Sequence, residues 1–181
     1  MTLEEMKTKV YSLIEEYSED ADDLTEDSDL SSKFNSVANQ VINEVARMKK
    51  INAYETREVT EGEVIEFSSL DNFYQLNIVR GIDCDVIGER IKANEAGTIE
   101  IYFYKYPTQI DIDTDDSQEL DLSTDALECA VYGIAADLLA ADVSSNYGRI
   151  YRERYRQLIQ ELDPRTALGS VYIDTATSFE L

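Results

Sequence analysis

Apolar residues recur every three or four positions near the start of the chain, which is the spacing of one face of an α-helix. Thr2 and Glu5 have the spacing of a capping box, in which each side chain accepts a hydrogen bond from the other residue's backbone N–H. The pattern predicts a helix over residues 2–18, followed by an acidic connector over 19–29. The apolar face of this helix consists of Leu3, Met6, Val10, Leu13, Ile14 and Tyr17.

A second helical pattern covers residues 29–50 and ends in a basic stretch, which suits the carbonyl end of the helix dipole. The short connector between the two segments predicts an antiparallel helix pair. The apolar face of the second helix consists of Leu30, Phe34, Val37, Ala38, Val41, Ile42, Val45 and Met48.

Alternation of apolar and polar residues replaces the helical spacing between residues 54 and 107. Glu61 and Gly62 stand between two β-prone segments, as in a hairpin turn. The pattern predicts an antiparallel β-meander of about four or five strands over 54–107. The other alternating segments are 74–80, 85–92 and 98–106.

Two further helices are predicted over 124–142 and 145–162. The first is rich in alanine, and Gly133 allows a neighbouring element to approach it closely. The residues of this helix that we expect in the core are Val131, Ile134, Ala135, Leu138 and Leu139. The stripe along the last helix consists of Tyr147, Tyr151, Tyr155, Leu158 and Leu162.

These elements define an α+β fold class: a helical bundle of about four helices with an inserted antiparallel β-meander and a flexible C-terminal tail. A chain of 181 residues suits one domain. We therefore expect a single domain over 1–163 and an extended tail over 164–181. Because no signal peptide and no membrane-spanning apolar run is visible, we expect a soluble intracellular protein.

The charge balance argues against functions that depend on binding to nucleic acids or membranes. The chain has 38 acidic and 16 basic residues, which gives a formal net charge of −22. Such a surface repels phosphate groups and anionic lipids, which argues against tight binding to nucleic acid or to a membrane.

The sequence also lacks the usual catalytic sets. Histidine is absent, which excludes Ser-His-Asp catalysis and His-ligated zinc. Cys84 and Cys129 are far apart, and the apolar helical pattern around Cys129 predicts a reduced core thiol. No Walker A, GxGxxG or GxSxG motif occurs. We therefore expect a protein that is not an enzyme, with no catalytic residues and no bound cofactor or metal.

An acidic run that includes Asp111, Asp113, Asp115 and Asp116 has some likeness to a calcium-binding loop. An EF-hand loop needs Gly at its sixth position and Glu at its twelfth. Counted from Asp111, those positions hold Asp116 and Leu122. We therefore favour a solvated acidic loop that leads into the next helix.

Arginines gather around the last helix although the chain is acidic, with tyrosines between them; Arg165 follows just after it. Three interpretations are open: contact with nucleic acid, pairing with acids of the same subunit, and pairing with the acidic face of an adjacent copy. We favour pairing over nucleic acid because of the net charge. The candidate subunit-interface residues are Arg149, Arg152, Arg154, Arg156, Tyr147 and Tyr151.

The order of these segments resembles the head–tail connector (adaptor) proteins of tailed bacteriophages over most of residues 1–163. The likeness rests on "IEIYFYKYPTQI" over 99–110, "DIDTDDSQELDLSTDALE" over 111–128, "AVYGIAADLLAAD" over 130–142, and the Arg/Tyr helix after them. The inserted β-meander is a departure from the smaller, all-helical connectors.

The resemblance implies a structural virion protein in the neck between capsid and tail, present in the host cytoplasm during assembly. It would form a ring, commonly dodecameric, that contacts the portal protein and a tail or neck protein. DNA would pass through the ring without tight binding. The implied channel-facing or interface acids are Asp111, Asp113, Asp115 and Asp116, together with the acidic segment 20–29. The implied portal-contacting residues of the tail are Arg165, Val171, Tyr172 and Ile173.

Three other functions stay open. The chain is also compatible with a tail-completion or tail-terminator protein, which would contact the tail tube instead of the portal. An acidic DNA mimic would instead occupy a basic nucleic-acid-binding protein. An enzyme that uses Asp or Glu with a divalent metal is the remaining alternative.

Overall fold

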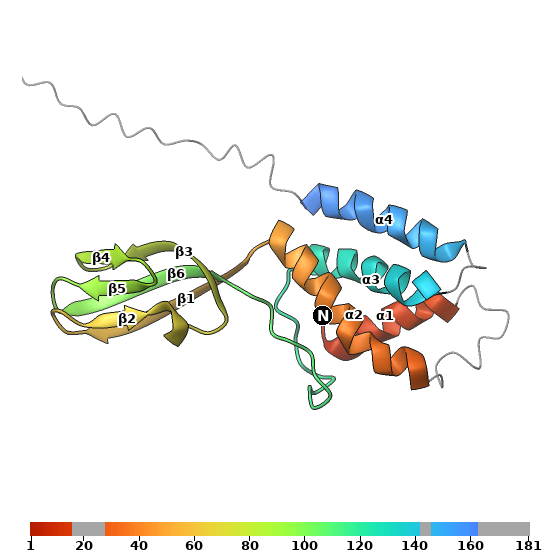
Figure 1. Ribbon diagram of the computed structural model, residues 1–181, viewed down its shortest axis with the longest axis horizontal. Coiled ribbons are helices and arrows are strands. Elements are labelled where there is room, and N and C mark those ends of the chain that lie inside the picture. Colours follow the sequence, from red (N-terminus) through yellow and green to blue (C-terminus); the bar gives the residue numbers. More distant parts are fainter. Residues whose placement is uncertain (16–27, 142–145, 163–181) are drawn as a thin grey trace, which may run out of the picture.

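The computed structural model describes residues 1–15, 28–141 and 146–162, and it has an α+β architecture. Within these ranges there are four α-helices and two antiparallel sheets of three strands each. The helices gather at one end of an elongated molecule and the strands at the other (Figure 1). No helix in these ranges combines the length and the apolar character needed to cross a membrane.

The four α-helices form where the three-to-four spacing of apolar residues predicts helices. Thr2 and Glu5 make the predicted capping box: the Thr2 N–H donates to Glu5 Oε2 at 3.1 Å, and the Glu5 N–H donates to Thr2 Oγ1 at 3.2 Å. The helices are α1 (Leu3–Glu15), α2 (Ser28–Met48), α3 (Thr124–Leu138) and α4 (Tyr147–Leu162), and a 3₁₀ turn, η3 (Leu139–Ala141), follows α3.

Helix α3 lies among the other helices and contacts α1, α2 and α4. The close approach predicted at Gly133 is confirmed, because a Cβ atom placed there would lie 2.7 Å from Val41 Cγ1 and 3.0 Å from the Tyr155 ring. The missing side chain therefore lets α2 and α4 pack against the same turn of α3. Of the core residues expected in α3 and η3, Val131, Ile134, Ala135 and Leu138 are buried and Leu139 is half-buried.

The strands form two sheets instead of one. The first sheet has the order β1-β6-β3 and the second has the order β2-β5-β4. The strands are β1 (Ile51–Val59), β2 (Val64–Glu66), β3 (Phe73–Arg80), β4 (Cys84–Ile87), β5 (Arg90–Ala93) and β6 (Gly97–Lys105), and a 3₁₀ turn, η2 (Phe67–Ser69), follows β2.

The strand order differs from that of the expected meander, in which strands adjacent in sequence would be neighbours. The last strand, β6, lies between β1 and β3. The apolar residues Ile99, Ile101 and Phe103 of β6 all point to one face and are buried. Covering this face requires a second layer, and the short strands β2 and β5 provide it with Ile65 and Ile91.

Buried apolar side chains form two separate clusters. The helical cluster combines residues from all four helices with Ile51, Ile110 and Leu122 from the segments that lead to and from the sheets. The β cluster lies between the two sheets. Each part of the molecule thus has its own core, and the start of β1 and the chain after β6 join the two parts (Figure 1).

We expect Gly133→Ala to be less stable than Gly148→Ala, because only the first substitution places a methyl group against Val41 and the Tyr155 ring. At Gly148, in α4, the nearest atom to an added Cβ is 3.4 Å away. Both variants gain the helix propensity of alanine, so the difference isolates the overpacking, which costs about 1–3 kcal/mol. Urea unfolding followed by far-UV circular dichroism measures this difference, and equal midpoints would contradict the close approach.

A second pair of glycines tests the packing in the part of the molecule that contains the two sheets, which we call the β part. A Cβ at Gly81 would lie 2.2 Å from the Thr98 carbonyl oxygen, whereas nothing lies within 4 Å of one at Gly62. Both residues have positive φ, at 105° and 82°, so alanine is strained at either position. We expect Gly81→Ala to cost about 2 kcal/mol more than Gly62→Ala in the free energy of unfolding. Amide hydrogen exchange of β6 measures the loss, and equal exchange rates in the two variants would refute it.

Candidate assembly surfaces

The acidic segment between β6 and α3, residues 107–123, is a loop fixed against the helices. The Ile110 N–H donates to Asn39 Oδ1 at 2.8 Å, and Asn39 Nδ2 donates to the Ile110 carbonyl oxygen at 2.7 Å. The Lys7 ammonium forms an ion pair with Asp116 at 2.6 Å. Ile110 and Leu122 are buried near the two ends of the loop. We refer to residues 107–123 as the acidic loop.

Carboxylates of the acidic loop shape its turns. Asp111 Oδ1 accepts hydrogen bonds from the Asp113 N–H and the Thr114 hydroxyl. Hydrogen bonds from the Ser117 N–H and hydroxyl hold the pKa of Asp115 below its ordinary value. In the part of the chain that the structure describes, no three His, Cys, Asp or Glu side chains gather in a position to hold a metal ion. The candidate channel or interface acids, Asp111, Asp113, Asp115 and Asp116, are all exposed.

An ion pair closes the junction between the β part and the acidic loop. Lys105, at the end of β6, donates to Asp121 Oδ1 at 2.8 Å, and the Thr108 N–H donates to Asp121 Oδ2 at 2.9 Å. Partial burial by itself would raise the pKa of Asp121. The hydrogen bonds from Lys105 and Thr108 outweigh this effect, so the pKa of Asp121 lies below its ordinary value.

The tyrosine stripe of α4 contributes mainly to the core. Tyr151 is buried, and its hydroxyl donates to the Leu13 carbonyl oxygen of α1 at 2.7 Å. Tyr155 is buried against Gly133, and burial, with the nearby charge of Glu44, raises the pKa of Tyr155. Tyr147 is half-buried and packs against the helical cluster. Of the candidate interface residues, Tyr151 therefore lies inside the subunit and is removed from the contact surface.

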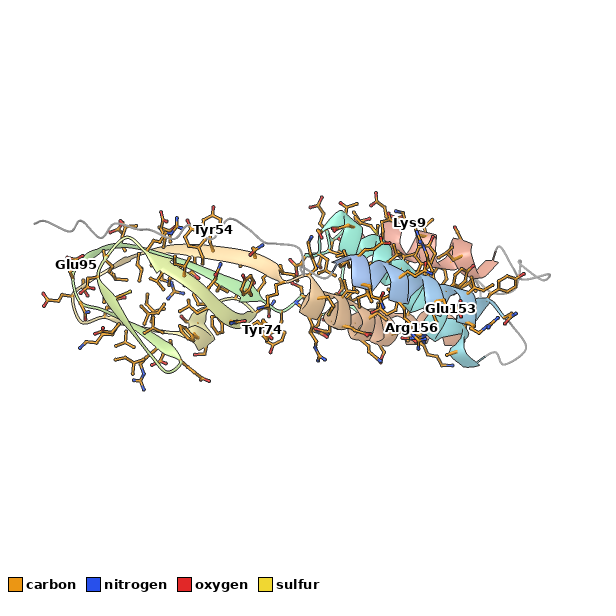
Figure 2. The ribbon with its side chains drawn as sticks, turned by 90° about the horizontal axis from the view of Figure 1, so that it is seen from above. Lys9, Tyr54, Tyr74, Glu95, Glu153 and Arg156 are labelled. Atoms are coloured by element: carbon orange, nitrogen blue, oxygen red, sulfur yellow. The ribbon has the colours of Figure 1, made fainter. Side chains whose placement is uncertain are left out.

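The arginines of α4 divide into two groups. Arg152 forms an ion pair with Asp137 of α3, so it pairs within the subunit. Arg149 Nε donates to Asn146 Oδ1 at 3.2 Å. Arg154 and Arg156 are exposed; Figure 2 labels Arg156 on α4. Arg149 is exposed as well, and so are Glu153 and Glu161 on the same helix.

The predicted portal-contacting residues and most of the first acidic connector are not among the described residues. Arg165, Val171, Tyr172 and Ile173 follow the last described residue, Leu162, and most of 20–29 lies in the gap between α1 and α2. The portal contact of the tail and the role of the acidic segment 20–29 therefore stay predictions.

The outer face of the first sheet carries a surface that the sequence did not reveal. Tyr54, Tyr102 and Ile78 lie opposite one another on β1, β6 and β3, and Tyr54 and Ile78 are 72% and 42% exposed. Figure 2 labels Tyr54 on β1. The Tyr54 and Tyr102 rings stack at 6.0 Å. Lys50 lies 4.5 Å from the Tyr104 ring centroid and Arg80 lies 5.6 Å from that of Tyr102. We call these six residues the tyrosine face. Alternation in β6 indicated that its tyrosines share a side, but not which strands flank them.

The two cysteines are free thiols. Cys129 is fully buried in α3, as predicted, and burial raises its pKa to about 12. Partial burial and the charges of Asp83 and Asp85 raise the pKa of Cys84. Both shifts disfavour the thiolate, so neither cysteine has the electropositive setting of a nucleophile.

No protein-family model matches the chain, and a search of curated proteins finds no significant match to it.

We expect Asp121→Asn to lower the free energy of unfolding at pH 7 by about 1 kcal/mol, because the Lys105 ion pair is only partly exposed. The folded-state pKa of Asp121 is depressed, so its contribution is present above the unfolded-state value of about 3.9 and is lost as the pH falls through the folded value. The difference between wild type and variant should therefore shrink in acid.

Asp113→Asn is the matched control, since it removes an equal charge from an exposed position in the same loop. Chemical denaturation at pH 7 and pH 3 measures both variants. A difference between wild type and Asp121→Asn that does not change with pH would rule out this role of the carboxylate.

Proposed function

We propose that this chain is a structural subunit of the head–tail connector type: a bundle of about four helices with an inserted β part, which assembles with its own copies into a ring between portal and tail. The observation that carries the proposal is that one subunit exposes both cations and carboxylates on different elements. Arg154 and Arg156 are exposed on α4, beside Glu153, whereas the exposed carboxylates of the acidic loop lie between β6 and α3.

Two complementary surfaces on one chain favour head-to-tail contacts. A contact between different surfaces of neighbouring copies leaves each copy with one free surface, so further copies add until the rotation closes a ring. Guanidinium groups on exposed helix positions suit such a contact because they bind carboxylates in a bidentate manner. Arg154 and Arg156 are thus the proposed subunit-interface cations, with Arg149 beside them.

The net charge suits a passage for DNA. At −22 the subunit repels phosphates, and a ring of such subunits would let DNA slide without the many cation–phosphate contacts that retain it. The exposed carboxylates of the acidic loop are proposed to face either this channel or a neighbouring copy.

The proposal has no catalytic step, and its partners are the portal protein, a tail or neck protein and other copies of the chain. Arg165, Val171, Tyr172 and Ile173 are proposed to reach the portal. The protein would act in the virion neck after assembly in the host cytoplasm.

The proposal is tested with the double variant Arg154→Glu/Arg156→Glu, co-expressed with the portal protein of the same virus. We expect electron microscopy to show rings of the wild-type chain on the portal and a loss of rings for the variant, because like charges then face each other. The control is Arg90→Glu/Lys92→Glu, which makes the same change of net charge at exposed positions of β5.

Rings that persist in the α4 variant, or that disappear equally in the control, would refute the role of α4. A chain found only free in infected cells would refute the connector itself. Contact with the tail tube alone would instead support a terminator, and tight one-to-one binding to a basic DNA-binding protein would support a DNA mimic.

A further inference from the structure

The acidic loop presents one large apolar side chain to solvent. Ile112 is 92% exposed, more than any other large apolar residue in the described part of the chain. Its neighbours do not move freely: Asn35 Nδ2 donates to the Asp111 carbonyl oxygen at 2.9 Å, and the Asp111 N–H donates to Thr114 Oγ1 at 2.9 Å. A fixed backbone that exposes an isoleucine has already lost the conformational entropy that binding would otherwise cost.

The tyrosine face has the composition of a protein-binding surface. Tyrosine and arginine are enriched at protein interfaces, and acidic residues are depleted there. Here Tyr54, Ile78 and Tyr102 form an apolar row across three strands, with Lys50 and Arg80 over the tyrosine rings. Two acids also belong to this face: Glu100 accepts a hydrogen bond from the Tyr102 hydroxyl at 3.0 Å and lies opposite Arg80, and Glu58 accepts one from the Thr98 hydroxyl. Lys50 donates to Gln75 Oε1 at 2.9 Å.

The acidic loop and the tyrosine face complement each other in apolar character and in charge. The loop offers one aliphatic side chain flanked by the carboxylates of Asp111 and Asp113, and both acids are exposed. The tyrosine face offers an apolar row flanked by two cations, Lys50 and Arg80. An isoleucine on the tyrosine rings would bring these carboxylates close to the cations.

We propose that the acidic loop of one copy docks on the tyrosine face of a second copy, with Ile112 packed against Tyr54, Ile78 and Tyr102. This inference rests on the self-assembly in the proposed function and names a second contact beside that of α4. It uses Asp111 and Asp113 of the acidic loop and leaves the exposed Asp115 and Glu119 to the arginines of α4. The contact joins different surfaces of the two copies, so it is heterologous and compatible with ring closure. It assigns the carboxylates of Asp111 and Asp113 to a subunit interface instead of the channel.

The test is disulfide trapping between two variants. Ile112→Cys and Tyr54→Cys are made separately, each with Cys84→Ser, while Cys129 is left in place because it is fully buried. The purified full-length variants are mixed, oxidised at concentrations up to about 1 mM, where even weak contacts are populated, and analysed on non-reducing gels. We expect a covalent dimer in the mixture, in several-fold excess over either variant alone.

The matched control replaces Ile112→Cys with Ile87→Cys, an exposed isoleucine on β4 that is 56% accessible. It should give only background cross-linking with Tyr54→Cys. Circular dichroism of each variant establishes that the substituted chains are folded.

A mixture that cross-links no better than this control overturns the docking contact, and so does a dimer formed by Ile112→Cys alone. Neither result touches the connector function, which depends on ring formation with the portal and on Arg154 and Arg156. Conversely, absence of wild-type rings on the portal together with efficient Ile112–Tyr54 trapping would leave this contact in place and refute the proposed function.

Discussion

The close packing around Gly133 is the constraint on which the helical part depends. Because α3 has no side chain at this position, Val41 of α2 and Tyr155 of α4 meet the same turn. The packing of α4 against α3 also determines which residues of α4 are exposed to solvent. Tyr151 and Tyr155 are four residues apart and turn inward, so Arg154 and Arg156, the sequence neighbours of Tyr155, lie at solvent on the two flanks of the helix. The packing inside the subunit thereby leaves both arginines exposed, one on each side of the buried tyrosines.

Local hydrogen bonds and ion pairs stabilise the carboxylates of the acidic loop. Within the acidic loop, Asp111 and Asp115 accept hydrogen bonds from neighbouring residues, and Asp116 and Asp121 pair with Lys7 and Lys105. These hydrogen bonds and ion pairs offset part of the repulsion among the carboxylates of the loop. A loop fixed in this way presents its outward carboxylates and Ile112 in a defined position, which a loose acidic segment would not do.

The two cores give the subunit two kinds of surface. The helical cluster supports α4 with its exposed arginines, and the β cluster supports the tyrosine face on the outer side of the first sheet. The acidic loop lies between them in sequence and is tied to both, through Asn39 of α2 and Lys105 of β6. Exposed charges of both signs on separate elements of one chain suit the proposed head-to-tail assembly.

The sequence by itself determined the helical segments, the capping box of Thr2 and Glu5, the close approach at Gly133 and the burial of Cys129. Each follows from local spacing or from the chemistry of one residue, which the helix converts directly into a position. The tertiary structure alone decided the strand order, the second sheet and the tyrosine face, because pairing between distant strands leaves no periodic trace. It also decided that Tyr151 is inside and Ile112 outside. The exposure of a residue depends on which other elements pack against it. The spacing of apolar residues along one helix or strand does not specify those elements.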